Sequence, residues 1–169
     1  MKKITKHQKD MIFNDLIHYY QFCKKDRRNH IFNAISFFKR FNRGEEMNVD
    51  LNQIKSSFVK SKISYDYYRK MKMVALLIKN GLLKFVSKED YIQAINDAIS
   101  NYELQVKTKL LHINASFNRI ESFKNSVDEN IVSLMEEEKK LLIDCKLYSV
   151  YLKKLESARI LLDRINSVS

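Results

Sequence analysis

The scarcity of proline and glycine constrains the fold of this chain more than any other feature. Its 169 residues contain no proline and only two glycines, Gly44 and Gly81. These residue types most often end or bend helices, so their near absence predicts long helices with few interruptions. A chain of this length can also bury a hydrophobic core as one domain or as two small ones. We therefore predict an all-α fold.

Positive charge is concentrated in the first hundred residues. Residues 1–100 contain 20 Lys and Arg against 10 Asp and Glu, whereas residues 101–169 contain 11 against 10. A basic region joined to a neutral helical region is typical of a nucleic-acid-binding domain attached to an assembly domain. Basic surfaces also bind membranes and acidic proteins. We expect a basic helical DNA-binding domain over residues 1–95 and a helical dimerisation region over residues 96–169.

The basic half has the pattern of several amphipathic helices. The spacing of apolar residues predicts helices over about residues 6–25, 30–42, 51–59 and 65–80, with short strands at 47–49 and 82–86. Thr5 with Gln8, then Asp50 and Ser64, are expected to cap three of these helices. The basic link at residues 24–28 fits a solvated helix end and a phosphate contact equally well.

The helix expected over residues 65–80 changes character along its length. Its first turns are polar, aromatic and basic, and its last turns are apolar. Such a helix can anchor its rear in a core while its front enters the major groove of DNA. The candidates for base-edge contacts are Tyr65, Tyr67, Arg69 and Lys70. The candidates for phosphate contacts are Lys55, Lys60, Lys62, Ser64, Lys84 and Lys88.

Residues 31–86 together resemble a winged helix-turn-helix domain. The expected order is helix, short strand, helix, turn, longer helix and strand, and the longer helix ends in Leu-Ile-Lys-Asn-Gly-Leu at 77–82. The resemblance implies that the 65–80 helix reads DNA. Two features depart from the family: Lys-Ser-Lys at 60–62 replaces the turn glycine, and residues 87–90 resemble a helix cap where a second wing strand would follow. A generic helical bundle with a basic face is the alternative.

The neutral half carries a seven-residue repeat. From Val106 to Leu162 apolar residues recur at spacings of three and four, broken at Lys124, Glu138 and Arg159. This predicts long helices packed at coiled-coil angles, either as one coil or as an antiparallel hairpin that turns within residues 121–130. We favour a homodimer interface over an intramolecular bundle. The expected interface residues are Leu134, Leu141, Tyr148, Leu152, Leu155 and Leu162.

No catalytic or metal-binding pattern is recognisable, and no cofactor or small-molecule ligand is inferred. Cys23 and Cys145 are isolated, which predicts buried free thiols rather than a disulfide. The first ten residues lack the apolar run of a signal peptide, and no apolar stretch approaches the roughly 20 residues of a membrane span. We expect a cytoplasmic protein that does not insert into membranes and is not an enzyme.

These expectations combine into two hypotheses about function. The first is a dimeric, sequence-specific DNA-binding protein, such as a transcriptional, plasmid or phage regulator. The second is an all-helical interaction protein, such as a subunit of a nucleoprotein complex or an inhibitor that binds an acidic partner. In the second case, cations would be spread over several helices rather than focused on residues 64–72.

Overall fold

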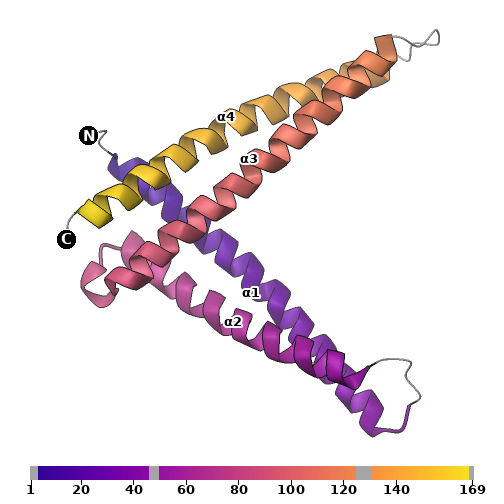
Figure 1. The fold of residues 1–169 in the computed structure, drawn as a ribbon, viewed down its shortest axis with the longest axis vertical. Helices are drawn as coiled ribbons and strands as arrows, with labels where there is room; N and C mark the ends of the chain where they lie inside the picture. The colour runs from indigo at the N-terminus through magenta and orange to yellow at the C-terminus, as the bar shows by residue number, and fades with distance from the viewer. Residues whose placement is uncertain (1–3, 46–49, 125–130, 168–169) are drawn as a thin grey trace. The chain divides into compact units, whose positions relative to one another are not determined.

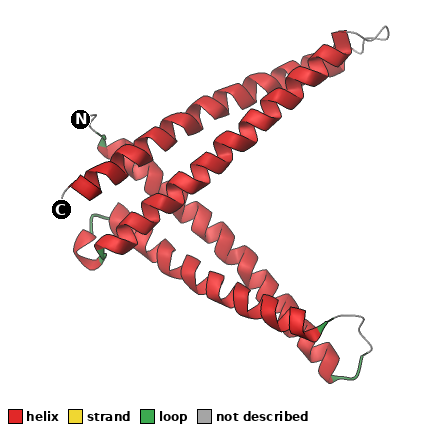
Figure 2. Ribbon diagram, in the orientation of Figure 1, coloured by secondary structure: helices red, strands yellow, loops and turns green. Residues whose placement is uncertain are grey.

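The computed structural model describes residues 4–45, 50–124 and 131–167. These residues form four helices and one short 3-10 helix (Figure 1): α1 (Lys6–Asn42), α2 (Leu51–Lys79), η1 (Leu83–Phe85), α3 (Lys88–Lys124) and α4 (Ile131–Ser167). Figure 2 shows no strand in this part of the chain. The predicted all-α class is confirmed.

Predicted capping residues bound the helices at several ends. The Gln8 N–H donates to Thr5 Oγ1 at 3.1 Å and the Thr5 N–H donates to Gln8 Oε1 at 2.9 Å, which completes the capping box of α1. Asp50 accepts from the Asn52 N–H at 2.8 Å at the start of α2. Gly81 ends α2 with a φ of 76°, a conformation that glycine adopts without strain.

The helices are longer than the sequence pattern predicts. Helix α1 continues through the basic link, where the Asp26 carboxylate lies 3.6 Å from His30 Nε2. Helix α2 continues through residues 60–63, where we expected a turn. Both expected breaks are wrong because their residues, which are polar except for Ile63, lower helix propensity only slightly, and because they contain neither proline nor glycine.

The expected strand at residues 82–86 is also wrong. Leu83–Phe85 forms a single 3-10 turn between the end of α2 and the cap of α3. The Ser87 hydroxyl, which accepts from the Asp90 N–H at 3.0 Å, begins the next helix before a strand could extend. The strand expected at residues 47–49 lies outside the described residues.

The chain divides into two compact units, one of which is Phe13–Ala94. In this unit α1 and α2 run antiparallel (Figure 1), because Phe38 packs on Phe58 while Tyr20 packs on Tyr68. Further along, Gln21 Oε1 accepts from Lys72 Nζ at 2.6 Å. The largest side chains of its core are Phe13, Leu16, Tyr20, Met71 and Ile78, each no more than 1% exposed.

The other unit comprises Met1–Ile12 and Ile95–Ser169. Here α3 and α4 form an antiparallel pair, one of the two arrangements that the repeat left open. Three contacts show the direction: Ser116 with Glu137, Lys109 with Asp144, and Tyr102 with Tyr151. Across these contacts the α3 residue number decreases while the α4 residue number increases. Each helix has 37 residues and is therefore about 55 Å long.

The seven-residue repeat of this unit splits into an inward and an outward stripe. The inward stripe is buried or half-buried and consists of Val106, Ile113 and Ile120 on α3 with Leu134, Leu141, Tyr148, Leu155 and Leu162 on α4. The outward stripe is exposed and consists of Leu110 and Phe117 on α3 with Glu138, Cys145, Leu152 and Arg159 on α4. Five of the six expected dimerisation residues therefore lie on the inward stripe, and Leu152 lies on the outward one.

Two further properties bear on function. Within the described residues, no helix combines the length and the apolar character that crossing a membrane requires. Both cysteines are free, but only Cys23 is partly buried, and Cys145 is exposed on the outward stripe. Burial raises the pKa of the Cys23 thiol, against the opposing effect of hydrogen bonds with Tyr19 and Tyr68.

Candidate nucleic-acid interface

Helix α2 is the most basic element of the chain. Its 29 residues include seven Lys or Arg and one carboxylate, that of Asp66. Helix α1, its antiparallel neighbour, contains eight Lys or Arg and three Asp. With so few carboxylates to neutralise these cations, the α1–α2 pair carries a strong positive potential, which attracts polyanions.

Three of the cations form a row along one side of α2. Lys55, Lys62 and Arg69 are seven residues apart, close to two turns of an α-helix, so their side chains leave the helix on the same side. At 1.5 Å per residue the row spans about 21 Å, which is about the length of six base pairs of duplex DNA. The side chains of Lys62 and Arg69 are 62% and 68% exposed. We call these three residues the cation row.

Asp66, the acidic residue of α2, does little to neutralise the row. Asp66 lies 4.0 Å from Lys62 Nζ through one carboxylate oxygen and 3.9 Å from Arg69 Nη2 through the other. Exposed pairs at such distances contribute little binding energy, because water screens them. Both cations can therefore exchange Asp66 for a phosphate oxygen.

The other candidates on this segment lie elsewhere around α2. Successive residues of a helix are about 100° apart, so Lys60 and Lys62 point in nearly opposite directions, as do Tyr67 and Arg69. Lys70 Nζ forms an ion pair of 2.6 Å with Asp90 at the start of α3. The four base-edge candidates therefore do not share a face. The structure groups Arg69 with Lys55 and Lys62, and separates it from Tyr67 and Lys70.

The position of Ser64 overturns one expectation. Ser64 and Tyr65 are half-buried in the middle of α2, so Ser64 caps no helix and no helix N-terminus is available there to contact DNA. Lys84 and Lys88 are exposed, but they lie in η1 and at the first residue of α3. Both follow the C-terminal end of α2, whereas Lys55 lies near its N-terminal end.

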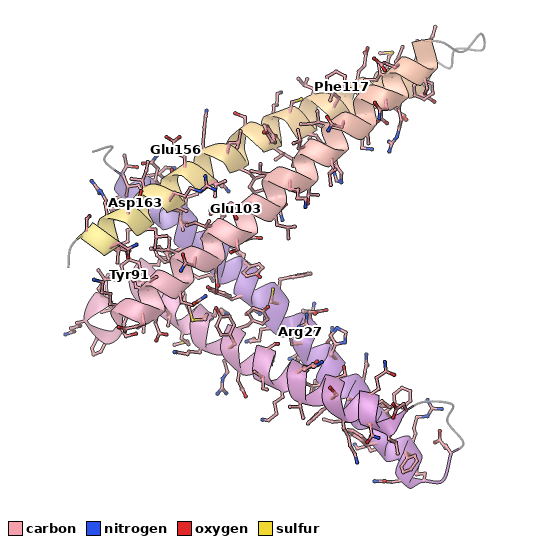
Figure 3. All side chains as sticks on the ribbon, in the orientation of Figure 1. Arg27, Tyr91, Glu103, Phe117, Glu156 and Asp163 are labelled. Atoms are coloured by element: carbon pink, nitrogen blue, oxygen red, sulfur yellow. The ribbon has the colours of Figure 1, made fainter. Side chains whose placement is uncertain are left out.

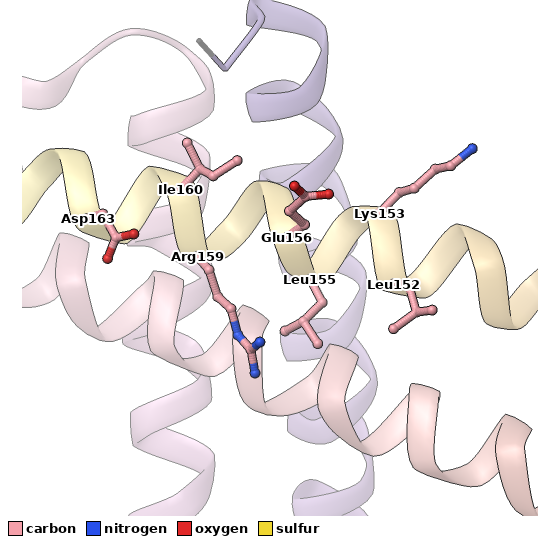
Figure 4. Close-up of a pocket in the computed structure, with 7 residues that line it drawn as sticks. All are labelled: Leu152, Lys153, Leu155, Glu156, Arg159, Ile160 and Asp163. Carbon is pink, nitrogen blue, oxygen red and sulfur yellow. The ribbon is translucent and has the colours of Figure 1, made fainter. Parts of the chain in front are cut away.

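A shallow depression on α4 offers no catalytic arrangement. Its volume is about 380 Å³, and it is lined by Leu152, Lys153, Leu155, Glu156, Arg159, Ile160 and Asp163 (Figure 4). Arg159 Nη2 donates to Glu103 Oε1 at 2.7 Å, so its guanidinium is engaged by α3. Across the described ranges, no three His, Cys, Asp or Glu side chains are grouped to hold a metal ion.

Comparison with protein-family models, curated proteins and solved structures finds no match to this chain. The resemblance to winged helix-turn-helix domains therefore stays a prediction. The chain's own charges and geometry support the candidate interface.

Proposed function

We propose that this protein binds duplex DNA through the α1–α2 pair, with the cation row of α2 on the phosphate backbone. The observation that carries the proposal is the excess of seven cations over one carboxylate on α2, with three of the cations aligned and open to solvent. Phosphate neutralisation supplies most of the affinity of proteins for duplex DNA. A row as long as about six base pairs can contact several phosphates at once.

Sequence preference, in this proposal, comes from Arg69. Its side chain is 68% exposed, and its guanidinium can donate two hydrogen bonds to the edge of one guanine. Lys55 and Lys62, on the same side of the helix, would fix the register on the backbone. This arrangement fits a regulator of transcription, or of plasmid or phage functions, that works in the cytoplasm.

The proposal includes a second copy of the chain. The outward stripe of α3 and α4 exposes Leu110, Phe117 and Leu152 at 44%, 52% and 40%. Exposed apolar side chains that recur along one stripe favour association, and two such helix pairs can bury them at coiled-coil angles. A homodimer would present two α1–α2 pairs to one DNA molecule.

Salt dependence of binding tests the DNA interface. We expect fluorescence anisotropy with labelled random duplexes to give log K falling linearly with log salt, by about 0.9 for each phosphate contact. Replacing Lys55, Lys62 and Arg69 by Gln should reduce this slope by about 0.9 for each phosphate that the variant no longer neutralises. The matched control replaces three exposed lysines of the neutral unit, Lys107, Lys146 and Lys153, by Gln. If both triple variants weaken DNA binding equally, the assignment of phosphate contacts to the cation row is contradicted.

One observation favours a second candidate, an interaction protein that binds an acidic partner. The cations are spread over both α1 and α2, as that hypothesis expects, and the base-edge candidates do not share a face. Poly-glutamate distinguishes the two. If it competes with duplex DNA at equal charge concentration, and selection from random duplexes enriches no sequence, the acidic-partner function replaces the DNA function.

A further inference from the structure

A shallow polar cleft, open to solvent, lies beside α2, away from the cation row. Its volume is about 360 Å³, and it is lined by Arg27 of α1 with Gln53, Ser56, Ser57, Lys60 and Ser61 of α2. Figure 3 labels Arg27 on α1. Because Lys60 and Lys62 are two residues apart on one helix, the cleft and the cation row open on nearly opposite sides of α2.

The cleft exists because the hairpin core is small at this level. Phe38 of α1 packs on Phe58 of α2. Ala34 on α1 and Ser61 on α2 lie one helical turn further along this helix pair. Both are buried, at 7% and 3% exposure, in positions where larger apolar residues would fill the space. A buried serine in a row otherwise occupied by Ile54, Phe58, Tyr65 and Tyr68 leaves a recess with a polar floor.

Hydrogen-bond donors dominate the lining. Arg27 offers a planar set of N–H donors, Lys60 an ammonium, Gln53 an amide, and the three serines one hydroxyl each. Among the residues that the structure describes, no carboxylate lines the cleft. The nearby Asp26 lies 3.7 Å from Arg27 Nε, and the two side chains are 46% and 40% exposed. An exposed ion pair of this length is weak, so Arg27 can turn to a ligand.

We propose that this cleft binds a phosphate group. A phosphate has three or four acceptor oxygens and at least one negative charge, which matches a guanidinium, an ammonium and several neutral donors better than the two oxygens of a carboxylate do. The group can belong to a free phosphate or to the backbone of a DNA segment. The second source rests on the proposed function, whereas the first does not. If a DNA segment occupies the cleft, the hairpin holds phosphates on both of its sides.

The probe is inorganic phosphate, titrated into the full-length protein in chloride buffer and followed by ³¹P line broadening and calorimetry. We expect saturable binding that sulfate displaces and that acetate at equal ionic strength does not. Lys60→Gln should weaken it by about tenfold or more, because a hydrogen bond to a charged group is removed. Lys79→Gln is the matched control, since it removes the same charge from the exposed C-terminal end of the same helix, away from the cleft and the cation row, and should leave binding unchanged.

A second variant protects the test against a folding artefact. Ser57 is exposed, so Ser57→Asp should leave the helix content by circular dichroism intact while it places a carboxylate among the donors and abolishes phosphate binding. Equal weakening by Lys60→Gln and Lys79→Gln, or no saturation in the unsubstituted protein, would overturn the proposal that the cleft binds phosphate.

Duplex DNA then identifies the source of the phosphate. Displacement of bound phosphate by a duplex, together with weaker DNA binding by Lys60→Gln, assigns the cleft to a backbone phosphate. Simultaneous binding of both assigns it to a free phosphate. Phosphate binding without any DNA binding would support the phosphate site and contradict the proposed function. DNA binding without saturable phosphate binding would support the proposed function and contradict the phosphate site.

Discussion

At the scale of single residues, the α3–α4 pair depends on polar contacts that face inward. Ser116 Oγ donates to Glu137 Oε1 at 2.6 Å, and Arg119 Nη1 lies 3.1 Å from the same oxygen. Lys109 Nζ lies 2.8 Å from Asp144 Oδ1, with the two side chains only 19% and 6% exposed. These contacts alternate with the apolar inward stripe and favour one register of the two helices, because a shift would leave the charges without partners.

Glu137 makes the stability of this pair depend on pH. The Ser116 hydrogen bond, followed by Arg119, holds the pKa of the Glu137 carboxyl below its ordinary value. A lowered pKa in the folded state contributes stability that is present above the unfolded-state pKa and is lost as the pH falls. Urea unfolding should show Glu137→Gln less stable than the unsubstituted protein at pH 7, with the difference shrinking towards about pH 3. Glu136→Gln, at the exposed neighbouring position, should show neither effect. A constant deficit for Glu137→Gln would contradict this role of the carboxylate.

Substitutions of Lys109 and Asp144 should have non-additive effects on the free energy of unfolding. Asp144→Leu leaves the largely buried Lys109 ammonium without this partner and should lower the free energy of unfolding by about 3 kcal/mol. Lys109→Met together with Asp144→Leu should recover most of that stability, because two apolar side chains can pack where the ion pair was. Chemical denaturation of both single variants and the double variant measures the coupling. Additive destabilisation would show that the pair does not act as a unit.

At the scale of elements, the end of α2 is set by Gly81. The Leu82 N–H donates to the Leu77 carbonyl at 2.9 Å and the Gly81 N–H to the Ile78 carbonyl at 3.1 Å, which is the Schellman arrangement. A Cβ at Gly81 would meet nothing within 4 Å, so only its φ of 76° opposes a side chain.

Gly81→Ala should therefore cost about 1–2 kcal/mol through backbone strain alone. Gly81→Asn should cost less, because asparagine tolerates this conformation better than alanine does. Thermal and urea unfolding of the two variants provide the measurement. An alanine variant as stable as the unsubstituted protein would contradict the assigned geometry.

At the scale of the whole molecule, the outward stripe predicts assembly. Sedimentation equilibrium should give a homodimer of about 40 kDa, twice the chain mass of 20.2 kDa. Phe117→Glu should produce a monomer, since it places an unpaired charge in the interface. Leu111→Glu is the matched control: Leu111 is 60% exposed on the same helix but lies off the stripe. A species of the single-chain mass at every concentration would contradict the homodimer. Equal effects of the two variants would contradict the assignment of its interface to the outward stripe.

The sequence alone determined the helical class, four of the helix boundaries and the uneven charge. Without proline and with two glycines, the chain could be expected to form long helices, and Thr5, Asp50, Ser87 and Gly81 act through bonds to neighbouring residues. Such local effects can be recognised from short motifs. The same reasoning placed false breaks at residues 24–28 and 60–63, because polar residues lower helix propensity without preventing a helix that tertiary packing supports.

Only the tertiary structure decided which residues share a face or a partner. It divided the heptad repeat into inward and outward stripes, because α3 and α4 fold back on each other and one helix can cover only one side of the other. It also separated Lys60 from Lys62 and placed Arg27 beside the serines of α2. These relations depend on helix continuity and on the register between distant segments, neither of which the spacing of residues along one segment specifies.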